Sequence, residues 1–105
     1  MKTEPGEVYW VDLGFAGKVR PVLVVSRTDP DAPRALSVCV PLTTQNRGSA
    51  YEVTMPRVPW LTEQGVANAQ GIVAIEHHRL GRRAGRFELH AMNEVRSALR
   101  GMLEL

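Results

Sequence analysis

An arginine and a pair of hydroxyl residues are the groups of this chain best suited to chemistry on a phosphate. Arg20 stands directly before Pro21 at the start of an apolar stretch, and Thr43 and Thr44 end a second apolar stretch that begins near residue 36. Proline disfavours helical geometry at the residue before it, so Arg20 should be held extended at the mouth of a strand. A fixed guanidinium beside a hydroxyl can bind one phosphate group.

The spacing of these residues predicts that they face each other. If the two stretches form an antiparallel hairpin through the turn-rich residues 27–36, the register that pairs Ser26 with Ser37 also pairs Arg20 with Thr43. Residues directly opposite each other on antiparallel strands lie about 4.5 to 5.5 Å apart. A bulge between the two pairs would break this register.

Other interpretations of the same residues are simpler. Arg20 taken alone is more readily a surface salt bridge at a strand end, and one of the two threonines has only β propensity and turn chemistry to explain it. His77 and His78 are candidates for a proton shuttle, because histidine as a residue type titrates near neutrality, but a histidine in the core or on the surface is the more common interpretation. Because adjacent strand residues point to opposite faces, at most one of them can join a given site.

Length and cysteine content limit the class of protein. A chain of 105 residues is predicted to form a single domain over residues 1–105, with one core. The lone Cys39 has no thiol partner for a disulfide or a thiolate zinc site, which favours a reducing compartment, the cytoplasm. The N-terminus has no apolar signal core and no stretch is long enough to span a membrane, so no membrane partner is expected.

Arginine dominates the basic residues, and four arginines cluster late in the chain. The cluster comprises Arg79, Arg82, Arg83 and Arg86. Such a run is usually a solvated surface, and the alternative is a positively charged surface that attracts and binds nucleic acid.

The elements that must position these residues are mainly strands. Strands are predicted at 8–13, 22–26, 36–42 and 51–55, with a short helical turn at 60–65 and either one interrupted strand or two at 66–69 and 72–75, bent near Gly71. Apolar residues at helical spacing predict an amphipathic helix over 89–103, frayed near Gly101. The order of elements indicates an α+β, mainly β fold: a small, strongly bent antiparallel sheet or barrel capped by one helix.

Taken together, these segments resemble the MazF/PemK/Kid toxins of bacterial toxin-antitoxin modules over nearly the whole chain. The matching segments are, in order, Gly6-Glu7-Val8-Tyr9-Trp10-Val11-Asp12-Leu13, Arg20-Pro21-Val22-Leu23-Val24-Val25-Ser26, Val40-Pro41-Leu42-Thr43-Thr44-Gln45, Tyr51-Glu52-Val53, Ile72-Val73-Ala74-Ile75-Glu76-x-x-Arg79-Leu80, and Val95 with Ala98-Leu99. Each segment alone is common, whereas their order and spacing together are specific.

The resemblance implies an SH3-like barrel with a C-terminal helix, a homodimer and a metal-independent endoribonuclease. Such an enzyme cleaves single-stranded RNA at short motifs, leaves 2′,3′-cyclic phosphate and 5′-hydroxyl ends, and is silenced by a cognate antitoxin, through which alone it associates with DNA. The family's catalytic arginine and hydroxyl map onto Arg20 and Thr43, the same pair that the register brings together. No metal or cofactor is expected. Candidate substrate-binding residues are Lys18, Thr44, Gln45, Gln70 and His77.

Two departures from the family pattern concern the loops. Many relatives place a longer loop with Gly-Ser-Glu-Gln before the Arg-Pro motif, whereas this chain has a shorter loop without an acidic residue. Relatives also often have a Ser/Asp-Gln pair before the late Ile-Val strand, where this chain has Gln70-Gly71. The base preference of the relatives is therefore not expected to hold for this chain.

Two further hypotheses belong to other classes. One is a non-catalytic toxin of the same fold that inhibits a protein target such as DNA gyrase, and the other is an SH3-like nucleic-acid-binding or adaptor domain. Trp10 and Tyr9 are possible base-stacking residues, although a tryptophan in a first strand is more often core or interface. The presence of both Arg20 and Thr43 favours the nuclease, because a protein inhibitor needs no phosphate-binding pair.

Overall fold

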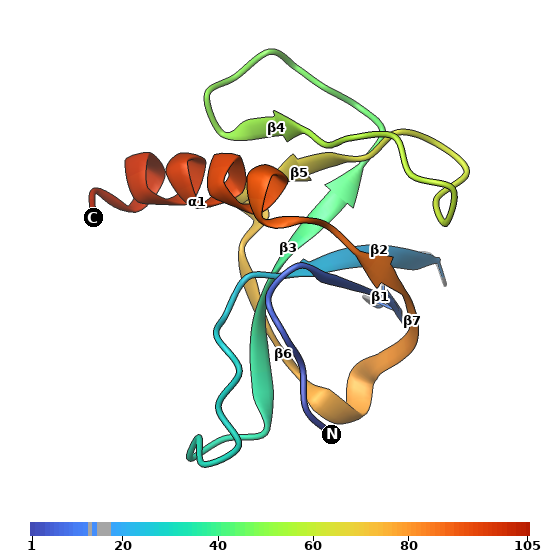
Figure 1. The fold of residues 1–105 in the computed structure, drawn as a ribbon, viewed down its shortest axis with the longest axis vertical. Helices are drawn as coiled ribbons and strands as arrows, with labels where there is room; N and C mark the ends of the chain where they lie inside the picture. Colours follow the sequence, from blue (N-terminus) through green and yellow to red (C-terminus); the bar gives the residue numbers. More distant parts are fainter. Residues whose placement is uncertain (13, 15–17) are drawn as a thin grey trace.

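The computed structural model describes residues 1–12, 14 and 18–105, which form seven strands, two short 3-10 turns and one helix (Figure 1). The elements in chain order are β1 (Glu7–Asp12), β2 (Val19–Val24), β3 (Leu36–Thr43), β4 (Glu52–Thr54), β5 (Val66–Asn68), η1 (Ala69–Gly71), β6 (Val73–Glu76), η2 (His77–Arg79), β7 (Leu80–Arg86) and α1 (Leu89–Leu103). The predicted mainly β fold with a C-terminal helix is confirmed.

All strand pairs are antiparallel, and β3 is the centre of the sheet. The strand order is β4-β5-β3-β2-β1-β7, and β6 also pairs with β3. The first half of β3 pairs with β6 and its last two residues pair with β5, so the sheet divides along this one strand (Figure 1). Among the described residues, the pairing does not close the sheet into a complete barrel.

The pairing of β2 with β3 has the register that the sequence predicts. Val22 lies opposite Pro41, Leu23 opposite Val40 and Val24 opposite Cys39. Beyond β2, the amides of Val25 and Ser26 both donate to the carbonyl of Val38, at 2.9 and 3.3 Å, and the hairpin ladder ends there. Continued in the other direction, the same register places Arg20 of β2 opposite Thr43 of β3.

Both faces of the central strands are buried, because alternate side chains enter two separate clusters. One cluster lies under α1 and contains Val8, Leu23, Val40, Met55, Phe87 and Val95 among others. The other contains Tyr9, Val11, Val22, Val24, Cys39, Ile75 and Leu80. This two-sided burial explains the near-continuous apolar runs of β2 and β3, and burial raises the pKa of the Cys39 thiol to about 12.

Helix α1 has the bounds that its hydrophobic spacing predicts. Met92, Val95 and Leu99 are buried against the sheet. The helix continues through Gly101 and ends at Leu103, and the residue that follows, Glu104, caps it in a left-handed conformation with φ 58°. No helix among the described residues is long and apolar enough to cross a membrane.

One prediction about the elements was wrong, the alternative of two strands near Gly71 was confirmed, and one predicted residue was not tested. Residues 60–65 form turns and bends instead of a helical turn. The segment around Gly71 is a 3-10 turn between two strands, since β5 and β6 pair with different parts of β3. The last residue of the predicted first strand, Leu13, lies outside the described residues.

Strand β7 was missed altogether. Its arginines and glycines have low strand propensity, so the sequence gives no strand pattern here. The backbone amides and carbonyls of β7 find hydrogen-bond partners by pairing with β1. Because Gly85 has no side chain, the indole of Trp60 can pack directly on the backbone of β7. Trp60 also packs against Phe87, with the ring centroids 4.9 Å apart. The glycines that weaken the strand signal in the sequence are therefore required by the packing.

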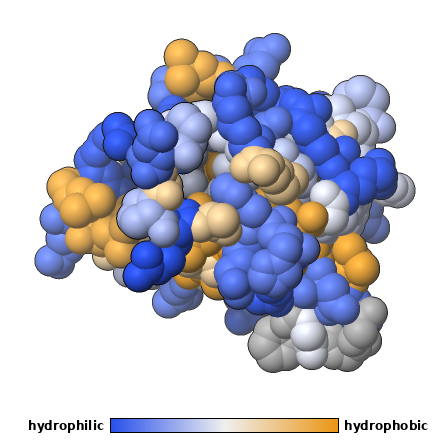
Figure 2. All heavy atoms as spheres, turned by 90° about the horizontal axis from the view of Figure 1, so that it is seen from below, coloured by the Kyte–Doolittle hydropathy of each residue, from blue (hydrophilic) through white to orange (hydrophobic). Residues whose placement is uncertain are grey.

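The surface is mainly hydrophilic on the face that Figure 2 shows, where apolar residues form separate groups instead of one continuous patch. Most of the exposed large apolar side chains of the described residues lie near the ends of elements or of the chain. The most exposed are Met1, Val19, Leu89, Leu103 and Leu105.

Candidate functional site

The predicted pair, Arg20 and Thr43, lines one cleft of about 260 Å³ at the end of the sheet where β2 begins. Strands β1, β2 and β3 form one wall, and the segment between β4 and β5 forms the other. The lining residues are Trp10, Arg20, Pro21, Leu42, Thr43, Thr44, Leu61, Thr62, Glu63 and Gly65. The hairpin register therefore brings the cation and the hydroxyl into the same cleft.

Arg20 is exposed, and its guanidinium forms no salt bridge or hydrogen bond with any described residue. Pro21 follows it and lies opposite Trp10 of β1 in the ladder. The simpler interpretation of Arg20 as half of a surface salt bridge therefore finds no partner in the described part of the chain. Its five donors therefore have no acceptor among the described residues.

The Thr43 hydroxyl is oriented by the backbone. Its Oγ1 accepts a hydrogen bond from the amide of Gln45 at 3.2 Å. Because the oxygen is the acceptor, the hydroxyl proton stays available for donation to a ligand in the cleft. Thr44 lines the same cleft, but its side chain makes no hydrogen bond with the described residues.

A second hollow adjoins the cleft, and Thr43 lines both. It measures about 430 Å³ and is lined by Thr43, Gln45, Arg47, Ser49, Tyr51, Glu52, Asn68 and Gln70. Two predicted substrate-binding residues, Gln45 and Gln70, lie here. The cleft and this hollow share Thr43, and we call the two together the groove.

His77 lies elsewhere. It belongs to η2, where its Nε2 is 2.8 Å from the Oγ of Ser37, and it lines a different hollow of about 590 Å³. Ser37 precedes Thr43 by six positions on β3, which is about 20 Å of extended strand. The described chain therefore does not bring His77 to Arg20. His78 is exposed in the same turn, 3.9 Å from the carboxylate of Glu76.

Lys18 is exposed two positions before Arg20 and does not line the cleft. Most of the shortened loop that precedes it, Leu13 and residues 15–17, lies outside the described residues.

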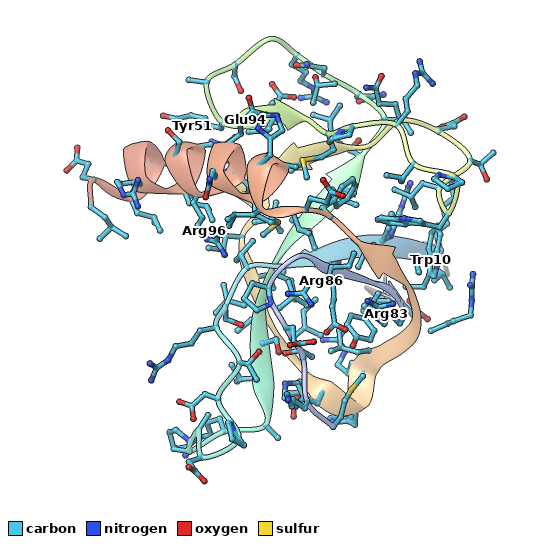
Figure 3. All side chains as sticks on the ribbon, in the orientation of Figure 1. Trp10, Tyr51, Arg83, Arg86, Glu94 and Arg96 are labelled. Atoms are coloured by element: carbon cyan, nitrogen blue, oxygen red, sulfur yellow. The ribbon has the colours of Figure 1, made fainter. Side chains whose placement is uncertain are left out.

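The late arginine cluster is mostly engaged in holding the fold together. Arg83 donates to Glu7 at 2.8 Å, Arg86 lies 3.4 Å from Glu4, and Arg79 donates to the carbonyl of Asp12 at 3.1 Å. Arg83 and Arg86 are labelled in Figure 3. Of the four, only Arg82 makes no contact of this kind with described residues, so the cluster is chiefly structural.

Tertiary folding brings to the cleft Glu63, which the sequence did not mark, and Trp10, which the sequence offered only as a possible base-stacking residue. Glu63 contributes a carboxylate from the segment between β4 and β5, and no motif in the sequence marks it. Trp10 lines the cleft at the β2 end of the sheet (Figure 3), and its buried Nε1 has no hydrogen-bond partner among the described residues. Tyr9, in contrast, is buried on the other face and donates to Glu7 at 3.1 Å, which excludes it from base stacking.

The family of the chain follows from comparisons with known proteins. Residues 4–103 match the model of the PemK-like, MazF-like toxins of type II toxin-antitoxin systems. No curated protein sequence matches the chain significantly.

Solved structures agree over the full chain. An endoribonuclease in complex with its cognate antitoxin, from a mycobacterial species, is 32% identical, with a TM-score of 0.86 over 98% of this chain and 96% of that chain. An endoribonuclease from a mycobacterial species is 31% identical, with a TM-score of 0.83 over 98% of this chain and 92% of that chain.

A third structure extends the fold comparison. MazF in a MazE-MazF complex from Deinococcus radiodurans is 24% identical and has a TM-score of 0.83 over 100% of this chain and 98% of that chain. The family model covers every strand and the whole of helix α1. The chain therefore belongs to the PemK-like, MazF-like toxins of type II toxin-antitoxin systems.

Proposed function

We propose that this chain is a sequence-specific endoribonuclease that cleaves single-stranded RNA without a metal ion and is neutralised by a cognate antitoxin. The observation that carries the proposal is the convergence of Arg20 and Thr43 in one cleft, in a chain 32% identical to an endoribonuclease. The hollow that shares Thr43 with the cleft is lined by polar residues, which suits an extended, charged polymer.

The chemistry proposed is attack by the ribose 2′-oxygen on the adjacent phosphorus. The new bond joins the 2′-oxygen to phosphorus and the bond from phosphorus to the 5′-oxygen breaks, which leaves a 2′,3′-cyclic phosphate and a 5′-hydroxyl. Arg20 stabilises the charge that grows on the phosphate oxygens, and the Thr43 hydroxyl donates to the same phosphate. A permanently charged guanidinium is a poor base, so Arg20 has an electrostatic role.

Two protons must also be moved. Among the described residues that line the cleft, Glu63 supplies the carboxylate. We assign Glu63 the role of general base, which accepts the proton of the 2′-hydroxyl. Water protonates the departing 5′-oxygen, and Glu63 then returns its proton to solvent. A cation, a hydroxyl donor and a proton acceptor in one cleft supply what a metal ion would otherwise provide, which supports metal independence.

The direct test is cleavage of a long single-stranded RNA by the purified protein in EDTA. Discrete fragments with 2′,3′-cyclic phosphate ends are expected, and Arg20→Ala should lower the rate by about 10²-fold or more, because a donor aimed at developing charge is lost. The matched control is Arg82→Ala, an exposed arginine outside the cleft, which should retain activity. Intact RNA together with inhibited DNA gyrase would replace this proposal with the protein-inhibitor alternative.

The partners proposed are single-stranded RNA, a second copy of the chain and an antitoxin. A mycobacterial relative was solved in complex with its cognate antitoxin. We propose that the antitoxin of this chain has an acidic, disordered tail that folds along the groove and excludes RNA, and that DNA is reached only through the antitoxin complex. A homodimer would carry two grooves, and the cytoplasm is the proposed compartment.

A further inference from the structure

We infer that the hollow beyond Thr43 binds the nucleotide next to the cleaved linkage, with Arg47 on its phosphate and the amides of Asn68 and Gln70 on its base edge. This inference rests on the proposed function, because it assigns a substrate subsite to the same groove. It goes further in assigning roles to Arg47, Asn68 and Glu52 in choosing where the RNA is cut.

The position of the hollow follows from Thr43. Thr43 lines both the cleft that holds Arg20 and the second hollow, so an RNA chain with its scissile phosphate at Arg20 and Thr43 has a neighbouring nucleotide at this hollow. Its volume of about 430 Å³ exceeds the 260 Å³ of the cleft. Volumes of about 300 Å³ and above are typical of ligand pockets.

Arg47 provides a second cation, in the hollow that shares Thr43 with the cleft of Arg20. It is exposed, and its guanidinium forms no salt bridge or hydrogen bond with the described residues. Thr43 therefore lines one hollow with each of the two arginines. Two cations separated in this way suit two successive phosphates of one strand.

The loop that carries Arg47 is held by hydrogen bonds, and Glu52 accepts three of them. The Oε2 of Glu52 accepts from the amide of Arg47 at 2.9 Å, and its Oε1 accepts from the amide and the hydroxyl of Ser49, at 3.0 and 2.8 Å. These hydrogen bonds hold the pKa of the Glu52 carboxyl below 4.5. Both carboxylate oxygens are occupied by the loop, which makes Glu52 a positioning residue rather than an RNA contact.

Asn46 completes the loop. Its amide nitrogen donates to the Oγ1 of Thr54 at 3.0 Å, and its amide oxygen accepts from the amide of Gly48 at 2.8 Å. A loop fixed before binding loses less conformational entropy when RNA arrives, which favours affinity.

The opposite wall carries the groups that can read a base. Asn68 ends β5, and Gln70 lies in η1, which packs tightly on β3: a Cβ at Gly71 would lie 3.0 Å from Pro41 Cγ. Neither Asn68 nor Gln70 has a side-chain hydrogen bond with the described residues. An amide both donates and accepts, so it can distinguish one base edge from another.

Tyr51 closes the hollow on the side toward α1, where Figure 3 shows it near Glu94. Its side chain is 38% exposed, which leaves a ring face available for stacking on a base. The hollow thus combines a phosphate-binding cation, two amides and an aromatic ring, the groups that single-strand readers use.

The test combines cut-site sequencing with steady-state kinetics. On a mixed RNA pool, Asn68→Ala and Gln70→Ala should relax the preference at one position beside the cut and leave the other positions unchanged. On a single oligonucleotide, Arg47→Ala should raise KM about tenfold with kcat nearly unchanged, since it removes binding common to ground and transition states. The matched control is Arg57→Ala, an exposed arginine that lines neither hollow.

Glu52→Gln tests the positioning role. An amide cannot accept hydrogen bonds at both ends, so KM should rise in the same direction as for Arg47→Ala, and the double variant should be no worse than Arg47→Ala alone. A purely structural role would instead lower the melting temperature without changing KM. RNA binding measured in the Arg20→Ala background keeps the subsite readout independent of catalysis.

The outcomes separate the two proposals. If the wild-type protein cuts RNA and Arg20→Ala does not, but the Arg47, Asn68 and Gln70 variants keep the wild-type KM and cut-site preference, the subsite is overturned and the nuclease stands. If the wild-type protein neither cuts nor binds RNA, the proposed function fails and the subsite fails with it.

Discussion

Thr43 and Thr44 are neighbours in the sequence, but only Thr43 has its hydroxyl fixed by a backbone amide, that of Gln45. The fixed hydroxyl is pre-organised to donate to the phosphate, whereas the Thr44 hydroxyl is not restrained by the described residues. Pre-organised donors contribute most to transition-state stabilisation, because they need no rearrangement during the reaction. The two residues should therefore differ in their effect on kcat.

We expect Thr43→Val to lower kcat by about 10²-fold and Thr44→Val to change it by less than about tenfold. Valine keeps the shape and β propensity of threonine, so both variants should fold, which circular dichroism would check. The measurement is single-turnover cleavage of one oligonucleotide by the two variants. Equal losses in both, or a larger loss in Thr44→Val, would remove Thr43 from the proposed chemistry.

At the scale of elements, β7 depends on close contact between its backbone and an aromatic side chain. Gly85 lies directly beneath the indole of Trp60, and an added Cβ would overlap the ring. Trp60 belongs to the partly buried shell of the larger core cluster and packs on Phe87. The same strand holds β1 through its ladder, so a displaced Trp60 disturbs the edge of the sheet.

Gly85→Ala should therefore destabilise the protein by about 1 to 3 kcal/mol, the usual cost of overpacking. Thermal unfolding should show a decrease of roughly 4 to 8 °C per kcal/mol for a domain of this size. Gly101→Ala is the matched control with the opposite sign. Nothing lies within 4 Å of a Cβ there, and alanine in a helix gains about 0.5 to 1 kcal/mol over glycine. A stabilising Gly85→Ala would contradict the packing described.

At the scale of the whole molecule, a carboxylate near the N-terminus is tied to the last strand. Glu7 is 7% exposed, and it accepts from Arg83 at 2.8 Å, from the amide of Glu4 at 2.7 Å and from Tyr9 at 3.1 Å. Burial by itself would raise the pKa of Glu7, but these hydrogen bonds and the charge of Arg83 outweigh it and hold the pKa below 4.5. Burial and then the Glu7 charge raise the pKa of Tyr9.

A carboxyl whose pKa is lowered by folding stabilises the native state above its unfolded pKa, and this contribution is lost as the pH falls through the folded value. We expect Arg83→Gln to lower the free energy of unfolding by about 1 to 3 kcal/mol at pH 7, the worth of a hydrogen bond to a charged group. The difference from wild type should shrink as the pH falls through the lowered pKa of Glu7, where this carboxyl becomes protonated. Urea unfolding at several pH values measures it.

The control for this prediction is Arg82→Gln, the adjacent arginine, which makes no ion pair with the described residues and should leave the pH dependence unchanged. A loss of stability in Arg83→Gln that is equal at pH 7 and in acid would show that packing of the arginine stem, and not the charge of Glu7, is what matters.

Local sequence signals determined those elements of this protein whose apolar residues follow a regular period. Apolar spacing defined α1 to the residue, and two apolar stretches with a turn between them defined the register of β2 and β3. From that register alone, Arg20 and Thr43 could be placed together, because a hairpin converts distance along the chain into a fixed pairing in space. The family resemblance rests on the same segments and agrees with them.

Only the tertiary structure decided the rest of the groove. Glu63 and Arg47 stand on irregular loops, where no period links position in the chain to direction in space. Strand β7 was hidden because its glycines serve packing contacts with distant residues, and local propensity carries no record of them. His77 stayed at the far end of β3 for the converse reason: a residue type suited to catalysis acquires that role only where the fold places it.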